Sequence, residues 1–543
     1  MAEHDYDVLI RGGTVYDGSG GPPFLGDVAI TGDSIVSVGP GGGGESRRGR
    51  REIDAAGLAV APGFINMLSW AAETLIADGR SQSDIRQGVT LELFGEGSSL
   101  GPLNQEMKQF LRERQGDIQY DITWTTLDEG LTELVRRGVS CNVASLVGAE
   151  TLRVHELGHA DRRPTPEELE RMRALARQAM EDGALGVGSS LIYAPACFAD
   201  TDEMVALAEV AGAYGGMYAS HIRNEGNRLL EAIDELVEIS RRSGAPAEIW
   251  HFKASGPANW PKLDAAIERV EAARAEGLHL TADMYTYPAS STGLDATMPG
   301  WVQEGGHRAW VERLKDPAIR ARLRHELSTA SGHGENEFLS AEKILLVGFR
   351  NEALRPLTGK SLAEVAQLRG TSVEDTIMDL IVEDDSRIQS VFFTMSEENV
   401  RKAVGLGWMG FCSDAGSLAP EGVFLHTSTH PRAYGSFARL LARYVRDERV
   451  IPLEEAVRRL TSLPADNLGL ERRGRLAPGQ YADVVVFDPS TVQDHATFER
   501  PHQYATGMRD VFVNGQQVLR EGEHTGATPG RVIRGRGYRK GPR

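Results

Sequence analysis

The sequence predicts an α/β fold: a (β/α)₈ barrel with a small β-sandwich domain formed by both chain termini. Through the middle of the 543-residue chain, apolar strand-like runs alternate with amphipathic helical segments. Strands that alternate with helices make a parallel sheet, and eight such units close into a barrel. The two ends of the chain instead carry short strands separated by turn residues, which is typical of a small all-β unit.

Eight strand-like runs support the barrel prediction. They are Gly63–Leu68, Thr90–Gly97, Cys141–Gly148, Ala184–Tyr193, Gly216–Arg223, Glu248–Ser255, His279–Tyr287 and Trp408–Gly416. Helical segments separate these runs. The clearest begins at the N-cap residue Thr165, which is followed by Pro166 and the capping-box residue Glu168. Gly183 is predicted to end this helix.

The chain ends show turn signals between short strands. Near the N-terminus, two strands are predicted around a Gly12-Gly13 turn, and Pro40–Arg51 is predicted to be an exposed loop. Near the C-terminus, Asn514-Gly515 between two apolar runs predicts a hairpin. We therefore assign residues 1–61 and 475–543 to the β-sandwich and residues 62–474 to the barrel.

A polar, mostly helical stretch at about 293–342 interrupts the alternation. It predicts a lid-like insertion between the seventh and eighth barrel strands. Lys343–Gly348 and Ser390–Met395 are further strand-like runs, and we assign them to the extended connection before the eighth strand.

Composition and charge exclude several classes of protein. The formal net charge of −18 predicts a surface that repels nucleic acid and anionic lipid. We expect no secretory signal, because the N-terminal residues lack a basic region followed by an apolar one, and no run approaches the roughly 18 apolar residues of a membrane helix. Three cysteines are too few for a disulfide framework and indicate a reducing compartment. We expect a soluble, cytoplasmic protein without nucleic-acid or membrane partners, and a solvated tail in the basic run 529–543.

Polar side chains end several predicted strands, where a barrel of this kind carries its chemistry. Glu96 ends the second strand, His221 the fifth, His251 the sixth and Asp414 the eighth. His221 and His251 are 30 residues apart, about one βα unit, so both should point into the same barrel mouth. Two imidazoles and a carboxylate there can hold Zn²⁺ with one position open for water. Asp414 is placed to accept the proton of that water.

A structural interpretation of the same residue types remains open. The chain has 14 histidines, and an isolated histidine is more often exposed or hydrogen-bonded in a core than bound to a metal. We interpret His155, His159, His325 and His333 in that way. Cys412 faces the same side of its strand as Asp414 and is interpreted as an apolar barrel filler.

Several segments occur in an order and spacing that point to a known family. They are VLIRGGTVYDGSG, VAPGFI, QGVT, SHIRNE, DMYTYPASST, HPRAYGSF, LTSLPADNLGL and GQYADVVVFDP. Together, from about Asp7 to Thr525, they resemble the D-aminoacylase (N-acyl-D-amino-acid deacylase) branch of the amidohydrolase superfamily. The resemblance implies a metal-dependent hydrolase that cleaves the C–N amide bond of a small N-acylated substrate. It also implies a β-sandwich beside a barrel, and a lid before the last barrel strand.

The resemblance implies roles for individual residues. His221 and His251 fall on zinc-binding histidines, and Asp414 falls on the catalytic aspartate. Arg432, in the HPR segment, falls on the arginine that binds the substrate carboxylate. Tyr287 falls on a tyrosine that contacts the same carboxylate.

Two further residues are expected to reach the substrate. Tyr193, which ends the fourth strand, is expected to donate a hydrogen bond to the substrate carboxylate or to the oxyanion. Lys253 is interpreted as a polar residue behind the metal ligands or in contact with substrate. It is not interpreted as a carboxylated, metal-bridging lysine, because such a lysine ends the fourth strand and Ala184–Tyr193 contains none.

The chain departs from the family pattern on the first and second strands. Relatives carry Asp-x-His-x-His after the PGFI segment, whereas Leu68 and Trp70 occupy the two histidine places here. Neither can bind zinc, so the second metal position is lost. Glu96 replaces the family's cysteine ligand, and a glutamate can still bind a metal. We therefore expect one Zn²⁺ per chain on Glu96, His221 and His251, although Mn or Fe also fits such a ligand set.

Three functions remain open on this evidence. The first is hydrolysis of an N-acyl amino acid, with an N-acyl-D-amino acid as the favoured substrate. The second is hydrolysis of another amide, such as a peptide or a cyclic amide, because Leu68 and Trp70 place apolar bulk where a metal would sit. The third is a metal-free barrel with a binding role.

Overall fold

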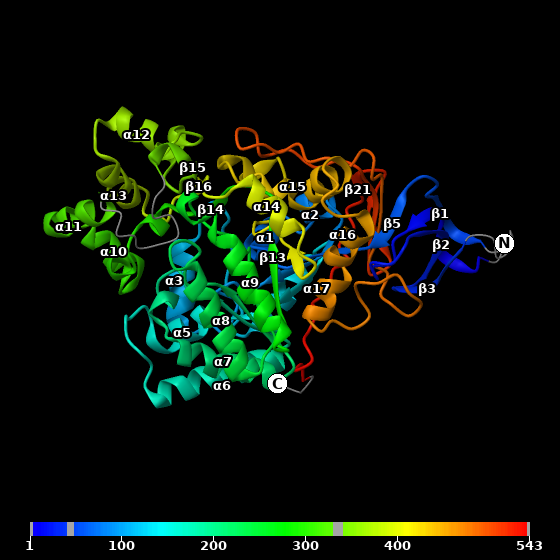
Figure 1. The fold of residues 1–543 in the computed structure, drawn as a ribbon, viewed down its shortest axis with the longest axis horizontal. Coiled ribbons are helices and arrows are strands. Elements are labelled where there is room, and N and C mark those ends of the chain that lie inside the picture. The colour runs from blue at the N-terminus through cyan, green and yellow to red at the C-terminus, as the bar shows by residue number, and fades with distance from the viewer. Residues whose placement is uncertain (1–3, 41–47, 329–339, 540–543) are drawn as a thin grey trace.

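The computed structural model describes residues 4–40, 48–328 and 340–539. Figure 1 shows three regions along the long axis of the molecule. A β-sheet formed by the two chain ends lies on the right, parallel strands surrounded by helices lie in the middle, and an insertion rich in helices lies at the upper left.

The parallel strands follow the eight predicted runs, which confirms these runs as strands. They are β6 (Phe64–Asn66), β7 (Val89–Phe94), β8 (Asn142–Ser145) with β9 (Val147–Gly148), β10 (Gly186–Ser190), β11 (Met217–His221), β12 (Ala247–Ile249), β13 (Leu280–Met284) and β17 (Met409–Phe411). They form one sheet in the order β6-β7-β8 and another in the order β9-β10-β11-β12-β13-β17. Every residue of these strands is buried, as expected for parallel strands covered by helices.

Backbone hydrogen bonds join the two parallel sheets at both junctions. At one junction, Leu146 N donates to Phe94 O over 2.8 Å, so the segment between β8 and β9 stays beside β7. At the other, Met67 N donates to Phe411 O over 3.3 Å and Asp414 N donates to Leu68 O over 2.9 Å. The last parallel strand therefore lies beside the first.

Helices connect and cover these strands. They are α1 (Ala71–Ala77), α2 (Gln82–Ile85), α3 (Gln105–Arg114), α4 (Leu127–Arg137), α5 (Ala149–Leu157), α6 (Pro166–Asp182), α7 (Thr201–Ala213), α8 (Leu229–Ser243), α9 (Lys262–Ala275), α14 (Glu397–Val404), α15 (Arg432–Arg439), α16 (Leu453–Leu460) and α17 (Ser462–Asn467). The predicted capping box of α6 is confirmed: Thr165 and Glu168 each accept a hydrogen bond from the other's backbone N–H. Gly183 ends this helix with a left-handed φ of 108°.

The two chain ends form a single nine-stranded sheet. Its strands are β1 (Tyr6–Val15), β2 (Phe24–Thr31), β3 (Ser34–Gly39), β4 (Gly49–Asp54), β5 (Ala59–Pro62), β18 (Val484–Phe487), β19 (Met508–Val513), β20 (Gln516–Arg520) and β21 (Glu523–His524). The link between the two ends is the antiparallel pair of β5 with β18. The predicted hairpin is confirmed as β19–β20, because Asn514 and Gly515 both adopt the positive φ that a tight turn requires.

Two predictions near the N-terminus are wrong. Gly12-Gly13 is not a turn, because β1 continues through it with a shift of register against β2 between Ile10 and Gly13. Gly12, at φ 65°, is the position that needs a glycine in this irregularity. The end of the predicted 40–51 loop is strand β4, which pairs in parallel with β1; residues 41–47 lie outside the described residues.

The insertion between β13 and β17 is larger than the predicted stretch at 293–342. It contains α10 (Gly306–Arg313), α11 (Pro317–Ser328), α12 (Leu362–Arg369) and α13 (Val373–Asp384), together with the sheet β14 (Ser290–Gly293), β16 (Gln389–Phe392) and β15 (Ile344–Gly348). The strands β15 and β16 match the two extra strand-like runs. The insertion has its own apolar core, with Leu294, Trp310 and Phe392 among its members. Residues 329–339 of the predicted stretch lie outside the described residues.

The basic C-terminal run is not a solvated tail over its described part. Arg531 pairs with Asp33 at 2.7 Å, and Arg534 Nε donates to Asp128 over 3.0 Å. Val532 also forms a parallel bridge with Val143 of β8. Acidic groups of the chain therefore neutralise part of this basic run. Residues 540–543 lie outside the described residues.

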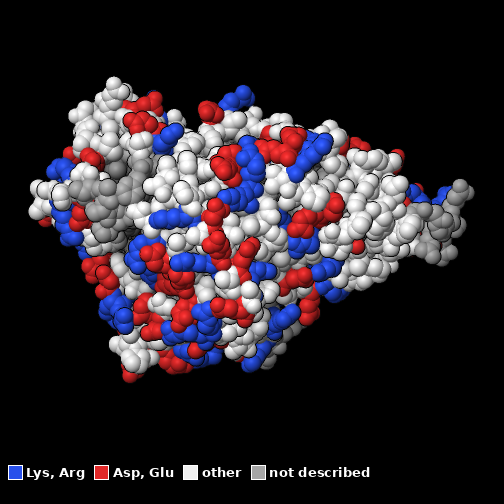
Figure 2. Space-filling model, viewed as in Figure 1, with Lys and Arg blue, Asp and Glu red and all other residues white. Residues whose placement is uncertain are grey.

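The surface carries mixed charge. Figure 2 shows acidic and basic side chains interspersed over the helical region, whereas the end formed by β1 to β5 shows few of either. Within the described ranges, no helix is both long enough and apolar enough to cross a bilayer.

A polar cluster around Asn514 fixes the terminal sheet to β8. The buried Asn514 side chain donates to Asn142 Oδ1 and to Pro529 O, both over 2.8 Å, and accepts from Arg473 over 2.8 Å. Its backbone N–H donates to Asp483, and its φ is 49°. This residue therefore combines a buried hydrogen-bond network with a left-handed backbone.

We predict that Asn514→Ala lowers the free energy of unfolding by about 2–4 kcal/mol, because it strands buried partners and strains the backbone. Asn514→Gly is the matched control, since it removes the same hydrogen bonds but tolerates the positive φ. It should cost less than Asn514→Ala, by about 1 kcal/mol. Chemical denaturation measures both values, and wild-type stability of the glycine variant would show that the network contributes nothing.

Candidate functional site

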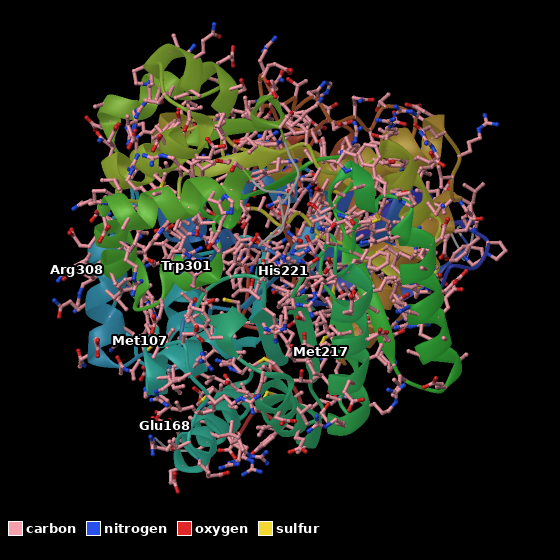
Figure 3. The ribbon with its side chains drawn as sticks, turned by 60° about the vertical axis from the view of Figure 1, so that its left-hand side comes forward. Met107, Glu168, Met217, His221, Trp301 and Arg308 are labelled. Carbon is pink, nitrogen blue, oxygen red and sulfur yellow. The ribbon has the colours of Figure 1, made fainter. Side chains whose placement is uncertain are left out.

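The candidate site lies where β7, β11 and β12 end. His221 is the last residue of β11, while Glu96 and His251 lie two residues beyond the ends of β7 and β12. Figure 3 shows His221 near the middle of the molecule, with Trp301 and Arg308 of the insertion to one side. Parallel strands bring their carboxyl ends to one edge, so these three side chains meet as the sequence predicts.

Glu96, His221 and His251 form a compact, buried group suited to a metal ion. One ligand atom from each residue lies within 4.8 Å of the other two. Glu96 Oε1 is 2.8 Å from His221 Nδ1 and 3.2 Å from His251 Nε2. The two imidazole rings stand nearly perpendicular, at 81°, with centroids 4.4 Å apart. Both rings thus direct one nitrogen toward the same carboxylate oxygen.

Burial and mutual attraction set the charges of the group. Burial raises the pKa of Glu96, but hydrogen bonds to His221 and His251 outweigh it and hold that pKa well below the usual range. Burial lowers the pKa of His221. His251 is opposed by burial and by Lys253, yet Glu225 and Glu96 raise its pKa to about 10. Without a metal, His251 is therefore protonated at neutral pH, and a cation that binds there displaces a proton.

Glu225 and Lys253 support the histidines from behind. Lys253 Nζ donates to Glu225 Oε1 over 2.6 Å, and the same oxygen lies 3.0 Å from His251 Nδ1. A carboxylate at Nδ1 orients the ring and leaves Nε2 for the metal side. Glu225 was not predicted, although it lies in the SHIRNE segment four residues after His221. A spacing of four residues brings two side chains together on a helix, but the chain is irregular after β11, so this spacing does not predict the position of Glu225.

Asp414 faces the group, as predicted, and two side chains hold it. Arg432 Nη1 lies 2.6 Å from Asp414 Oδ2. The Trp70 indole N–H is shared between Asp414 Oδ1, at 3.1 Å, and Glu96 Oε2, at 3.0 Å. Trp70 therefore joins the proposed base to the proposed metal ligand, a role that the sequence does not predict. Burial raises the pKa of Asp414, and the positive charges of Arg432 and His251 oppose that effect.

Two site residues have a left-handed backbone. His251 has φ 38° and Asp414 has φ 49°, and neither is a glycine. Asp283 Oδ1 accepts a hydrogen bond from His251 N over 2.7 Å and holds that turn. Non-glycine residues in this region cost about 1–3 kcal/mol and are found mainly at functional sites.

The structure brings Tyr285, not the predicted Tyr287, to the cluster. Tyr285 has Arg432 4.6 Å and Lys253 Nζ 5.8 Å from its ring centroid. The Tyr287 hydroxyl instead donates to Asp494 over 3.3 Å, and Arg439 stands 4.8 Å from its ring. The assignment of Tyr287 to the site therefore does not agree with the structure.

Tyr193 lies beside the metal-binding group. Its ring makes an edge contact with His221 at 5.1 Å between centroids. On its other side, Arg387 of the insertion stands 4.9 Å from the Tyr193 ring and is paired with Asp295. The insertion thus reaches the candidate site through Arg387.

The residues that we interpreted as structural include clear core members. Cys412, interpreted as an apolar barrel filler, is fully buried with Leu68 and Trp250 in one apolar cluster. Burial raises the pKa of the Cys412 thiol, which keeps it protonated. His159 packs edge-on against Phe110, and His333 lies outside the described residues.

Comparisons with known proteins identify the family. Residues 130–519 match the amidohydrolase family. A D-aminoacylase of Alcaligenes xylosoxydans xylosoxydans is 32% identical, with 97% of each chain covered. A solved D-aminoacylase has a TM-score of 0.79 at 32% identity, and the match covers 97% of this chain and 99% of that one. That enzyme has a binuclear metal centre, in which one metal activates and the second metal attenuates.

A second solved structure is similar over its whole length. It is the N-acyl-D-glutamate deacylase from Bordetella bronchiseptica, complexed with zinc and a phosphonate inhibitor that mimics the tetrahedral intermediate. It has a TM-score of 0.81 at 28% identity and covers 98% of this chain and 100% of its own. From the family match and the full-length similarity, the chain belongs to the amidohydrolase family, in its D-aminoacylase branch.

Proposed function

We propose that this chain is a metal-dependent hydrolase that cleaves the amide bond of an N-acyl-D-amino acid. The observation that supports it most is the convergence of Glu96, His221 and His251 on one buried point, opposite Asp414. The relatives at full length include a D-aminoacylase and an N-acyl-D-glutamate deacylase. A hydrolase of this class therefore fits both the site and the family.

The proposal includes a finer account of the fold. The bonds at both sheet junctions support a closed (β/α)₈ barrel over residues 62–474. The nine-stranded sheet of the two chain ends is the basis for a small β-sandwich over 1–61 and 475–543. The insertion, including its part at 293–342, serves as a lid over the barrel mouth. Arg387 supports this role, because it reaches the ring of Tyr193 beside His221.

One Zn²⁺ per chain is the proposed cofactor, and Mn or Fe would also suit this ligand set. The residues fit such an ion, because Glu225 at His251 Nδ1 leaves Nε2 directed to the same point as Glu96 Oε1 and His221 Nδ1. The chemistry that such a cation supplies is Lewis acidity toward the acyl carbonyl and toward water.

The side chains around this point divide the remaining work. Asp414 accepts a proton from water at one carboxylate oxygen and returns it to the leaving amine. Arg432 binds the substrate carboxylate, which then competes with Asp414 for the guanidinium. Tyr285 lies beside Arg432 and donates to the same carboxylate; in the structure its hydroxyl donates to Met395 Sδ, a weak acceptor, over 3.6 Å. Tyr193 donates to the developing oxyanion.

Two other functions would use the same site differently. Hydrolysis of a peptide or cyclic amide would keep the metal but change the substrate. A metal-free binding role would need neither zinc nor Asp414. Lys253, which donates to Glu225 and to the backbone carbonyl of His251, supports the ligand set in any reaction that uses the metal.

We predict that the purified chain holds one zinc and that His221→Ala loses it together with hydrolysis of N-acetyl-D-amino acids. His221 supplies one of three ligand atoms, and two remaining ligands hold zinc poorly. Elemental analysis measures the metal. His495→Ala, at an exposed histidine bonded to Thr506, is the matched control and should keep both properties. Full hydrolytic activity in a zinc-free chain would contradict the proposal.

A pair of tyrosine variants tests which ring reaches the substrate. Tyr285→Phe should raise KM roughly tenfold or more, because it removes a hydrogen bond to a charged carboxylate worth about 1.5–3 kcal/mol. Tyr287→Phe removes a bond to Asp494 and should leave KM close to the wild-type value. Steady-state kinetics decides between them, and the opposite pattern would restore Tyr287 as the contact.

The pH dependence tests Asp414 as the base. Burial raises its pKa, so activity should fall as the pH drops through a value above the ordinary aspartate range. Arg432 lowers this pKa, so Arg432→Met should move the acid limb of kcat/KM to higher pH. Arg432→Lys keeps the charge and should move it less. An acid limb that is unchanged in Arg432→Met would count against Asp414 as the titrating group.

A further inference from the structure

Trp70 stands at the meeting point of the two functional carboxylates. Its backbone N–H donates to Ala415 O over 3.0 Å, which fixes the residue at the start of α1 beside the eighth parallel strand. From there its indole N–H points inward and is shared by Glu96 Oε2 and Asp414 Oδ1. The residue as a whole is 47% exposed, so the polar edge of the indole is inside and part of the ring faces outward.

Two buried carboxylates that face each other repel unless positive charge or a donor lies between them. A second metal ion is one solution, and the D-aminoacylase with a binuclear centre has two metals. An indole N–H is a donor without a lone pair available for metal binding. It can therefore separate the carboxylates but cannot bind a cation in addition.

We propose that the Trp70 indole takes the place of a second metal ion, holds Asp414 in its working position, and restricts the site to a single cation. The inference rests on the proposed metal-dependent function. Trp70 is a positioning residue: it acts through Glu96 and Asp414. Arg432 holds the other oxygen of Asp414, so the two donors together fix the orientation of that carboxylate.

From this arrangement we expect the rate of the enzyme to be insensitive to excess metal. The D-aminoacylase described above shows attenuation by a second metal. In this chain, a second ion would have to bind Glu96 Oε2 and Asp414 Oδ1, and both oxygens already accept a hydrogen bond from the Trp70 indole N–H. Added zinc should therefore leave the rate of this enzyme unchanged.

The first test uses Trp70→Phe, which keeps an aromatic ring and removes the donor. We expect the zinc content to stay at one per chain and KM to stay within about twofold of wild type. We expect kcat to fall about tenfold, which corresponds to about 1.4 kcal/mol, because the shared N–H donor is lost. Trp124→Phe is the matched control. It also loses an indole N–H bond, to Leu100 O over 2.7 Å, but away from the site, and should retain wild-type kcat. A wild-type kcat in Trp70→Phe would overturn the positioning role.

The second test measures zinc uptake directly, by elemental analysis after equilibration with excess zinc and dialysis. Wild type should retain one zinc, whereas Trp70→His should retain two, on the new imidazole, Asp414 and Glu96. Two zinc ions in wild type would overturn the inference and leave the proposed hydrolase intact. No zinc in wild type would refute the proposed function and the inference together. A single zinc in Trp70→His, in a folded variant, would count against Trp70 as the residue that excludes the second ion.

Discussion

A buried carboxylate must be met by positive charge or by hydrogen-bond donors, and Glu96 imposes this requirement on the whole site. Its desolvation is compensated by His221 and His251 on one oxygen and by Trp70 on the other. Four separate strand ends must therefore reach one place. The parallel arrangement supplies this geometry, because it brings every carboxyl end to the same edge. A carboxylate that had lost these partners would be neutral at this burial, and could no longer serve as a metal ligand.

The hydrogen bonds around the site hold two residues in backbone conformations that they would rarely adopt without them. His251 and Asp414 both have positive φ, and each is tied by hydrogen bonds on more than one side. For His251 these ties are Asp283 at its backbone and Glu225 at its ring. Such ties offset the local strain, and they explain why polar groups are buried so densely here. Rigidity at these turns keeps the ligand atoms at fixed separation before any ion or substrate arrives.

The sequence predicted the strands well because each is a continuous apolar run with a helix signal on either side. It placed Glu96, His221, His251 and Asp414 at strand ends, because the end of each strand can be located from the residue at which its apolar run stops. The assignment of Tyr287 came from the family resemblance, and the alternation of side chains could not point to Tyr285 instead, because alternation holds only within a strand and β13 ends at Met284. The runs of β15 and β16 were recognised as strand-like, but the sheet that they form with β14 was not predicted, for a different reason. Its strands β14, β15 and β16 pair over long separations that no local pattern encodes.

The two replacements that follow the first parallel strand, Leu68 and Trp70, have opposite physical outcomes. Leu68 joins the apolar cluster below the site and fills volume with no polar contact to make. Trp70, two residues on, keeps a polar function, because its N–H reaches both carboxylates while part of its ring stays exposed. A neutral donor leaves Asp414 its full negative charge, whereas a second cation would stabilise that charge and weaken the base. The position of Trp70 therefore favours the proposed proton transfer by Asp414, and the replacement of the two histidines is compatible with an active enzyme.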